Sequence, residues 1–356
     1  MSLPLAAVLV AAALFGAATP ACKLLLRAFS PLQLAGLLYL GAAAGVLPIL
    51  LWQGSLDSPR RMSGTTRARL GGALLFGGLL GPLLLLLGLR QAPSASVALW
   101  LNLELVATIA LGHLLFHDRL TKTSAVAALG TLGAAVLLSA SGGPASIQAG
   151  LLVLLACLCW GLDNHLTALI DGISPVQTTF WKGLVAGTIN LALGLFTSPV
   201  GGGPAMVGLA LLVGAVSYGA SILLYIASAQ RLGATRAQIV FATAPFFGVL
   251  LSLLILGETL TALQGGVVLL AAASVGVLAI ERHGHAHEHG AMDHAHGHAH
   301  DDEHHRHPHP SGVIGRTHAH WHSHEPVTHA HAHWPDLHHR HAHRGDPEKP
   351  TSADRP

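Results

Sequence analysis

Long apolar runs dominate this chain as far as Ile280 and constrain its fold more than any other feature. Of all 356 residues, 51% are hydrophobic and only 10% are charged, whereas a soluble domain carries about 25% charged residues. A helix that crosses a bilayer needs about 20 apolar residues. Runs of this length, bounded by charges or by Pro and Gly clusters, lie at residues 4–26, 32–53, 69–90, 94–116, 121–140, 148–170, 175–197, 205–229, 236–256 and 260–281. The sequence therefore predicts an all-α integral membrane protein with ten transmembrane helices.

The two halves of this apolar region share a pattern, which begins at Gly88 in the first copy and at Ser228 in the second. Each copy opens with small residues and an Arg, continues as a long apolar helix, and closes with an acid followed by x-Leu-Thr. The closing motifs are 118–121 and 258–261. Because each half holds five helices, the second half enters the membrane upside down relative to the first. We therefore expect two inverted five-helix repeats, residues 3–140 and 148–281, as in carriers that open alternately to the two sides.

Lys and Arg residues lie unevenly in the loops between the runs. If the N-terminus is cytoplasmic, the outer loops hold only Arg27 and Arg90. The cytoplasmic loops then hold Arg60, Arg61, Arg67, Arg69, Arg119, Lys122, Arg231 and Arg236. Basic residues are in excess in the cytoplasmic loops of membrane proteins. We therefore expect a multi-pass protein of the cell (inner) membrane with both termini in the cytoplasm, and no nucleic-acid partner.

The composition changes abruptly at residue 282. Of the chain's 26 His, three (His113, His117 and His165) precede this point, so 23 lie in residues 282–356. Because this segment has few apolar side chains, we expect it to be a disordered cytoplasmic tail. Neutral imidazoles suit nickel, cobalt, zinc and copper. We expect no required cofactor, but divalent metal bound by the tail through His283, His285, His287, His289, His294, His296, His298, His300, His318, His320, His322, His324, His329, His331 and His333.

Polar and ionisable side chains inside the spans are candidates for a transport path, because each is costly to place in lipid. Glu104 shares a helix face with Trp100, and burial of a carboxyl group favours its protonated form. Glu104 is therefore the best-placed candidate proton carrier. The full set of candidates is Lys23, Trp100, Asn102, Glu104, Trp160, Asp163, Asn164, His165 and Lys182.

Other interpretations stay open for several of these residues. Lys23 could extend to the membrane surface, and the polar group of the sixth span could lie close to that surface. Lys182 could neutralise Asp163 or bind an anionic substrate. His113 and His117 are four residues apart and would share a helix face, which suits a metal site, although the sequence suggests no third ligand.

Several motifs in order resemble the drug/metabolite transporter superfamily, in its ten-helix EamA-like branch, over residues 3–281. Besides the acid-x-Leu-Thr endings, they are Phe15-Gly16 through Lys23, the small residues Ala92-Pro-Ser-Ala-Ser96, and Asn102-Leu-Glu104. The family often has Trp in place of Phe15 and Pro in place of Leu105, and Ala244-Pro245 of the second half keeps the Pro but lacks the acid. The resemblance implies cytoplasmic termini, a central cavity between the halves, and export of small metabolites or drugs.

Three functions fit the sequence. The first is a secondary, proton-coupled transporter that exports a small polar metabolite or drug and has a metal-binding tail. The second is an exporter of nickel, cobalt or zinc whose tail collects ions, and the third is a membrane-anchored metal store or sensor. No nucleophile–base pair or phosphate-binding loop indicates an enzyme. The expected partners are the lipid bilayer, a small-molecule substrate and divalent metal ions, and a homodimer is left open.

Overall fold

The fold is a bundle of helices followed by short strands. The computed structural model describes residues 3–53, 62–116, 118, 120–170, 173–199, 201–280, 284–289, 292–299, 317–324 and 327–332. The first half contains α1 (Leu3–Gly16), α2 (Ala18–Leu25), α3 (Pro31–Gln53), α4 (Gly64–Gly72), the π-helix η2 (Ala73–Leu80), α5 (Gly81–Gln91), α6 (Ser94–Trp100), α7 (Leu103–Phe116) and α8 (Lys122–Ser141). The second contains α9 (Gly143–Ala168), α10 (Pro175–Thr197), α11 (Pro204–Val213), the π-helix η3 (Gly214–Ala220), α12 (Ser221–Leu232), α13 (Ala234–Phe241), α14 (Ala244–Leu256) and α15 (Ala262–Ile280).

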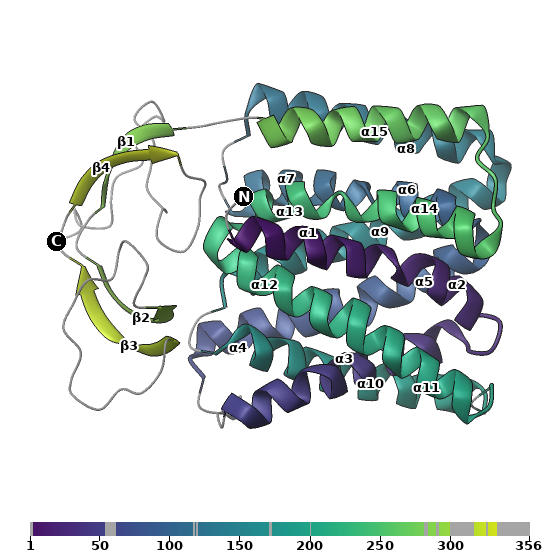
Figure 1. The fold of residues 1–356 in the computed structure, drawn as a ribbon, viewed down its shortest axis with the longest axis horizontal. Coiled ribbons are helices and arrows are strands. Elements are labelled where there is room, and N and C mark those ends of the chain that lie inside the picture. Colours follow the sequence, from purple (N-terminus) through teal and green to yellow (C-terminus); the bar gives the residue numbers. More distant parts are fainter. Residues whose placement is uncertain are drawn as a thin grey trace.

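The helices confirm the prediction of an all-α membrane protein. Nine helical stretches of the described residues are long and apolar enough to cross a bilayer, and α15 adds a shorter apolar stretch, Ala262–Val277. Each of these helical stretches begins and ends within a few residues of the ends of a predicted apolar run. Figure 1 shows them aligned along one axis of the bundle. Large apolar side chains such as Leu114, Phe196 and Leu254 are exposed on the outside, where lipid can cover them.

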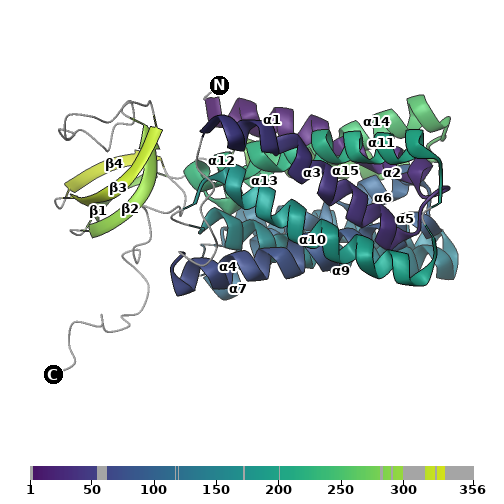
Figure 2. The same ribbon diagram turned by 90° about the horizontal axis from the view of Figure 1, so that it is seen from below.

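Corresponding helices of the two halves pack against each other. The second span of each half forms one such pair, α3 with α10, and the last span of each half forms another, α8 with α15. In Figure 1 the pair α8 and α15 makes an outer layer along one edge, and the view in Figure 2 keeps the helices along the same axis. This pairing is expected when two halves are related by duplication.

Glycines let α3 and α10 approach closely. A Cβ atom on Gly183 would lie 2.7 Å from the carbonyl oxygen of Tyr39, and one on Gly187 would lie 2.6 Å from the backbone nitrogen of Leu40. Neither position can hold a side chain unless the helices separate. Packing between small residues of this kind joins helices in lipid, where apolar burial supplies little driving force.

Irregular backbone occurs at matching places in the two halves. The π-helices η2 and η3 begin at Ala73 and Gly214. The fourth and ninth spans are both broken, and their second pieces, α7 and α14, begin at Leu103 and Ala244, with the same separation along the chain. Such interruptions persist in a bilayer only where neighbouring protein surrounds them, and π-helical turns are frequent at functional sites. The sequence alone predicts uninterrupted runs here.

Two helices begin with the same capping box, in which side chain and backbone hydrogen bond reciprocally. At the start of α3, Ser30 Oγ accepts from the Gln33 N–H (3.3 Å) and Gln33 Oε1 accepts from the Ser30 N–H (3.2 Å). Ser174 and Gln177 make the equivalent pair at α10, at 3.2 and 3.1 Å. Both sites have the sequence Ser-Pro-x-Gln. The two corresponding helices therefore begin with the same residues and the same hydrogen bonds.

The described parts of the His-rich tail are strands. β1 (Gly284–His289) pairs with β4 (Val327–Ala332), and β2 (Met292–Ala299) pairs with β3 (Thr317–His324), both antiparallel. The sequence predicts a disordered tail, and the structure describes extended backbone in these four segments of it. The physical reason is that His alternates with other residues in these segments, and a period of two fits extended backbone. Three of the predicted metal-binding residues, His283, His300 and His333, lie outside the described residues.

Candidate functional site

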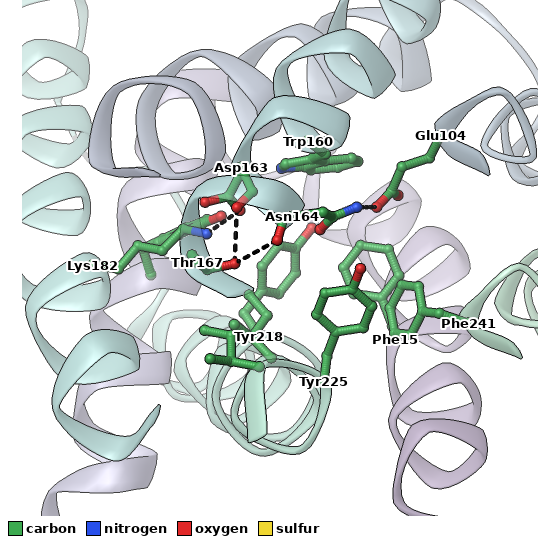
Figure 3. Close-up of a pocket in the computed structure, with 13 residues that line it drawn as sticks. Phe15, Glu104, Trp160, Asp163, Asn164, Thr167, Lys182, Tyr218, Tyr225 and Phe241 are labelled. Atoms are coloured by element: carbon green, nitrogen blue, oxygen red, sulfur yellow. Dashed lines mark hydrogen bonds and ion pairs between the residues drawn. The ribbon is translucent and has the colours of Figure 1, made fainter. Parts of the chain in front are cut away.

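A cavity lies between the two halves of the chain, as Figure 3 shows. Its walls come from α1, α3 and α7 of the first half and from α9, α10, η3, α12 and α13 of the second. The empty volume, open solvent included, is about 460 Å³. The lining residues are Phe15, Tyr39, Glu104, Trp160, Asp163, Asn164, Thr167, Lys182, Tyr218, Ile222, Tyr225, Ile226 and Phe241.

A buried ion pair forms one wall of this cavity. Lys182 Nζ of α10 donates to Asp163 Oδ2 of α9, and both residues are buried. The second carboxylate oxygen, Asp163 Oδ1, has no hydrogen-bond partner among the described residues. Lys182 was predicted either to neutralise Asp163 or to bind an anionic substrate. In the structure it neutralises Asp163. Gly77 of η2 packs against the Asp163 carboxylate, where no side chain would fit.

Asn164 connects the polar residues of three helices. Its Nδ2 group donates to Glu104 Oε1 of α7 (3.0 Å), Thr108 Oγ1 of α7 (3.2 Å) and Gln238 Oε1 of α13 (3.2 Å). Figure 3 shows Asn164 between Asp163 and Glu104. The network therefore ties the sixth span to the broken fourth and ninth spans.

Glu104 owes its position to the break in the fourth span. It lies in the first turn of α7, where the helix dipole favours a negative charge. Its side chain is buried, with the residue only 6% exposed. Among the described residues, no Lys, Arg or His lies within salt-bridge distance of its carboxylate. Glu104 is thus a buried acid that faces a cavity without a cationic partner.

Aromatic rings make up much of the remaining wall. Phe15 lies at their centre, with its ring centroid 5.8 Å from Trp160, 5.6 Å from Tyr218 and 5.3 Å from Phe241. Tyr225 continues the cluster, 5.0 Å from Phe241. The edge-to-face and tilted angles are those that aromatic pairs prefer. The rings give the cavity a firm apolar surface beside its acids.

All three tyrosines of the chain line this cavity. Tyr39 donates from its hydroxyl to the carbonyl of Gly77 in η2, which also accepts from Trp160 Nε1 at 3.2 Å. The hydroxyls of Tyr218 and Tyr225 are buried and have no partner among the described residues. None of these tyrosines is among the site residues predicted from the sequence. Their rarity inside apolar spans was a usable signal, because a buried Tyr hydroxyl usually has a specific partner.

The other predicted site residues lie outside this cavity. Lys23 Nζ donates to the carbonyls of Leu89 (2.7 Å) and Ala92 (2.8 Å), at the end of α5. His165 Nε2 contacts the carbonyl of Thr108 (2.9 Å), and its ring stacks on Phe116 with centroids 4.5 Å apart. The structure therefore brings together Glu104, Trp160, Asp163, Asn164 and Lys182 of the predicted set.

The remaining two candidates, Trp100 and Asn102, lie next to the break in the fourth span. Trp100 is fully buried, and Asn102 Nδ2 donates to the carbonyl of Leu99 at 3.1 Å, within the same turn. Among the described residues, no group of three or more His, Cys, Asp or Glu side chains is placed to hold a metal ion. His113 contacts the carbonyl of Asp118 through Nδ1 (3.0 Å), and His117 lies outside the described residues.

Comparison with known proteins gives matches of three kinds: a family, a protein sequence and a solved structure. The EamA-like transporter family matches the chain twice, over residues 2–140 and 148–280. An uncharacterized transporter of Methanothermobacter thermautotrophicus is 29% identical over 206 residues, which cover 54% of this chain and 59% of that protein. A protein of known crystal structure matches with a TM-score of 0.60 and 18% identity, over 77% of this chain and 95% of that chain. At this identity the last likeness extends to the fold alone.

Proposed function

This chain belongs to the EamA-like transporter family, and we propose that it is a secondary transporter that exports a small polar metabolite or drug in exchange for protons. The family and the apolar helices make it a multi-pass membrane protein of the transporter class. One observation carries the finer proposal. It is the placement of Glu104, a buried acid without a cationic partner among the described residues, in a cavity between the two halves.

A carboxylate in such a place favours binding of a proton or of a cationic ligand. Burial of an unpaired charge is costly, because the protein interior replaces little of the lost hydration. Ionisable residues inside transporter spans are typical of proton relays for this reason. Asn164 donates both to Glu104 and to Gln238, so a change at Glu104 would affect helices of both halves. That link couples the charge state of one residue to the arrangement of the carrier.

We also propose an orientation, with both termini in the cytoplasm of a cell whose inner membrane holds the protein. Basic residues of the described loops support it. Arg67, Arg69, Lys122, Arg231 and Arg236 would face the cytoplasm, against Arg27 and Arg90 outside. With this orientation, protons that enter the cell down their gradient would drive the substrate out.

Substrate-induced proton movement in liposomes tests the proposal. Purified protein is reconstituted with a pH-sensitive dye in the lumen, and amino acids, organic amines and salts of nickel, cobalt and zinc are added outside one at a time. We expect at least one organic compound to move protons faster than in protein-free liposomes, where only unaided passage of neutral amine changes the lumenal pH. Movement with a metal ion alone would favour the divalent-metal exporter instead. No movement with any compound would contradict proton coupling.

We also propose that the tail binds divalent metal ions. This binding would assist the carrier but would not determine which substrate it transports. The strand register places His opposite His, at 285 and 331, 287 and 329, 294 and 322, 296 and 320, and 298 and 318. Neutral imidazole is the ligand form, and its free pKa is about 6.5. Protons therefore compete with metal ions for the imidazoles. The tail should bind metal at a pH above this pKa and lose the metal at a pH below it.

Calorimetric titration with nickel and zinc checks this prediction about the tail. The full-length protein should bind several ions at about pH 7.5 and few at about pH 5.5, because the imidazoles titrate between these values. A chain truncated after Arg282 serves as the control and should bind almost none. Equal binding by the truncated chain would contradict the proposal.

A further inference from the structure

Resting on the proposed function, we propose that the cavity binds a monocationic organic amine with an aromatic or other apolar body. Besides tyrosines, the ionisable residues in its wall are Glu104, Asp163 and Lys182. Lys182 pairs with Asp163, so these two charges cancel. Glu104 remains as one acidic group in excess. A ligand with a single positive charge balances it in surroundings where charges are poorly screened.

Unpartnered polar atoms in the wall suit an ammonium group. Asp163 Oδ1 and the hydroxyl oxygens of Tyr218 and Tyr225 are buried and lack hydrogen-bond partners among the described residues. Buried polar atoms are nearly always paired, and three of the six unpaired side-chain atoms among the described residues lie in this one cavity, where a ligand could supply their partner. An ammonium group carries several N–H donors and no acceptor, and carboxylate and hydroxyl oxygens accept from it. A ligand carboxylate would instead lie near two acids, with the one Lys already engaged.

The aromatic rings favour the same ligand. The faces of Trp, Tyr and Phe attract cations at close range, and the attraction strengthens where water is excluded. Phe15, Trp160, Tyr218, Tyr225 and Phe241 form a continuous cluster, which can also pack against an apolar body. In Figure 3, Trp160 lies between Asp163 and Glu104 and the other four rings lie below them, so one amine could contact both acids and rings.

Three ligands that differ only in charge test this inference. Tyramine, tyrosine and 4-hydroxyphenylacetate share one ring and carry a net positive, zero and negative charge near neutral pH. Calorimetry on the full-length protein in detergent, with chelator present, measures each affinity. We expect tyramine to bind about tenfold or more tighter than tyrosine, and 4-hydroxyphenylacetate not to bind. Glu104→Gln should remove this preference, Tyr225→Phe should weaken tyramine binding, and Arg90→Gln, on the exposed end of α5, should leave it unchanged.

Several results would overturn this substrate class. Tyrosine binding as tightly as tyramine would indicate a zwitterion site, and binding of the anion would mean that Lys182 is free to accept it. If none of the three ligands binds a protein that moves protons with another compound, the amine inference fails while the proposed function stands. If tyramine binds but no compound moves protons, the amine inference stands while the proposed function fails.

A second inference rests on separate contacts at the ends of the bundle. Glu258, which follows α14, accepts hydrogen bonds from the backbone N–H groups of Ser94 and Ala95 at the start of α6, both at 2.8 Å. Asp118, which follows α7, accepts from the Thr235 hydroxyl at the start of α13, at 2.8 Å. Each acid thus joins the end of one half's broken span to the start of the other's.

These two contacts are counterparts of each other. The separation along the chain between Asp118 and Glu258 equals that between Ala95 and Thr235. Exchange of the two halves therefore converts one contact into the other. In Figure 1, α6 and α14 lie toward one end of the bundle and α7 and α13 toward the other. The contacts are not equal, since Glu258 binds two backbone groups whereas Asp118 binds one side-chain hydroxyl.

We infer that Glu258 and Asp118 are alternating latches. A carrier with two inverted repeats exchanges the conformations of its halves as it changes sides. In the state described here, Glu258 closes its end by capping α6. In the opposite state, Asp118 would engage the backbone at the start of α13 and close the other end, while Glu258 would release α6.

Distances between spin labels at the two ends test the latches. Labels at Gln91 and Leu254 report on the Glu258 end, and labels at Leu114 and Arg231 report on the Asp118 end, in a background without the native cysteines. We expect Glu258→Gln to widen the first distance distribution and narrow the second, and Asp118→Asn to do the reverse. Thr235→Val, which removes only a hydroxyl contact of the described state, should shift both distances in the same direction as Glu258→Gln. Unchanged distances, or the same shift in all variants, would overturn the inference.

Discussion

Lys182 and Asp163 depend on each other, because both side chains are buried and each is the other's counter-charge. Removal of one partner leaves an unpaired charge in a place of low dielectric, which costs about 3–5 kcal/mol. Removal of both leaves no such charge. We therefore expect Lys182→Met alone to lower the unfolding temperature strongly, and the double variant Lys182→Met/Asp163→Leu to recover most of the loss. Thermal unfolding in detergent, followed by tryptophan fluorescence, measures both.

An exposed basic residue provides the control for this pair. Arg90 lies at the exposed end of α5, and Arg90→Met should change stability little, because surface charges contribute about 0–1 kcal/mol. Equal losses in the single and double variants would contradict the account. That result would mean that the two residues stabilise the bundle independently, without a shared ion pair.

The sequence predicted the charged residues of the site better than its uncharged ones. Glu104, Asp163 and Lys182 could be identified because charge is rare and costly inside a span. Tyr218 and Tyr225 were missed because charge was the main signal for site residues and a Tyr side chain is uncharged, although Tyr is rare in these spans. Lys23 was predicted as a site residue, but in the structure its ammonium group donates to the carbonyls of Leu89 and Ala92, outside the cavity. Only the fold decides which of two neighbouring polar groups a long side chain reaches.

Spans could be predicted as elements, but their interruptions could not. Nine of the predicted runs match helices because length and apolarity suffice to define a span. Glycines flank η2 (Gly72 and Gly81) and begin η3 (Gly214), but Gly is also common in the uninterrupted helices of this chain, so it did not identify these places or the break before Leu103. These interruptions depend on neighbours that satisfy the displaced backbone groups. In the tail, by contrast, the alternation of His with other residues can be read from the sequence. The strands that follow this alternation were nevertheless not predicted.

Close packing of α3 on α10 leads to a prediction for glycine. Gly183→Ala places a methyl group 2.7 Å from the carbonyl oxygen of Tyr39, so the helices must move apart at a cost of about 1–3 kcal/mol. The matched control is Gly133→Ala in α8, where a Cβ atom meets nothing within 4 Å. That change should leave stability unchanged or raise it by up to about 1 kcal/mol. Thermal unfolding of the two variants side by side gives the answer, and equal effects would refute the packing account.

The molecule as a whole joins two inverted halves, and its sidedness can be measured directly. We expect green fluorescent protein fused after residue 356 to fluoresce, because it folds in the cytoplasm. Alkaline phosphatase, which is active only outside, should be active when fused after Arg27 and inactive after Gln53. The excess of basic residues in the proposed cytoplasmic loops is the physical reason. The opposite pattern of activity would reverse the orientation and contradict the placement of both termini in the cytoplasm.

The central claim is that Glu104 couples substrate movement to protons, and one flux measurement addresses it. Wild-type and Glu104→Gln protein are reconstituted at equal density, and flux of the compound that moves protons in the wild type is recorded with and without a pH gradient. We predict that the gradient accelerates flux in the wild type and that Glu104→Gln loses about tenfold or more of the gradient-driven flux, although the protein still folds. A Glu104→Gln protein whose flux responds to the gradient as the wild type does would contradict the claim and remove Glu104 from the mechanism.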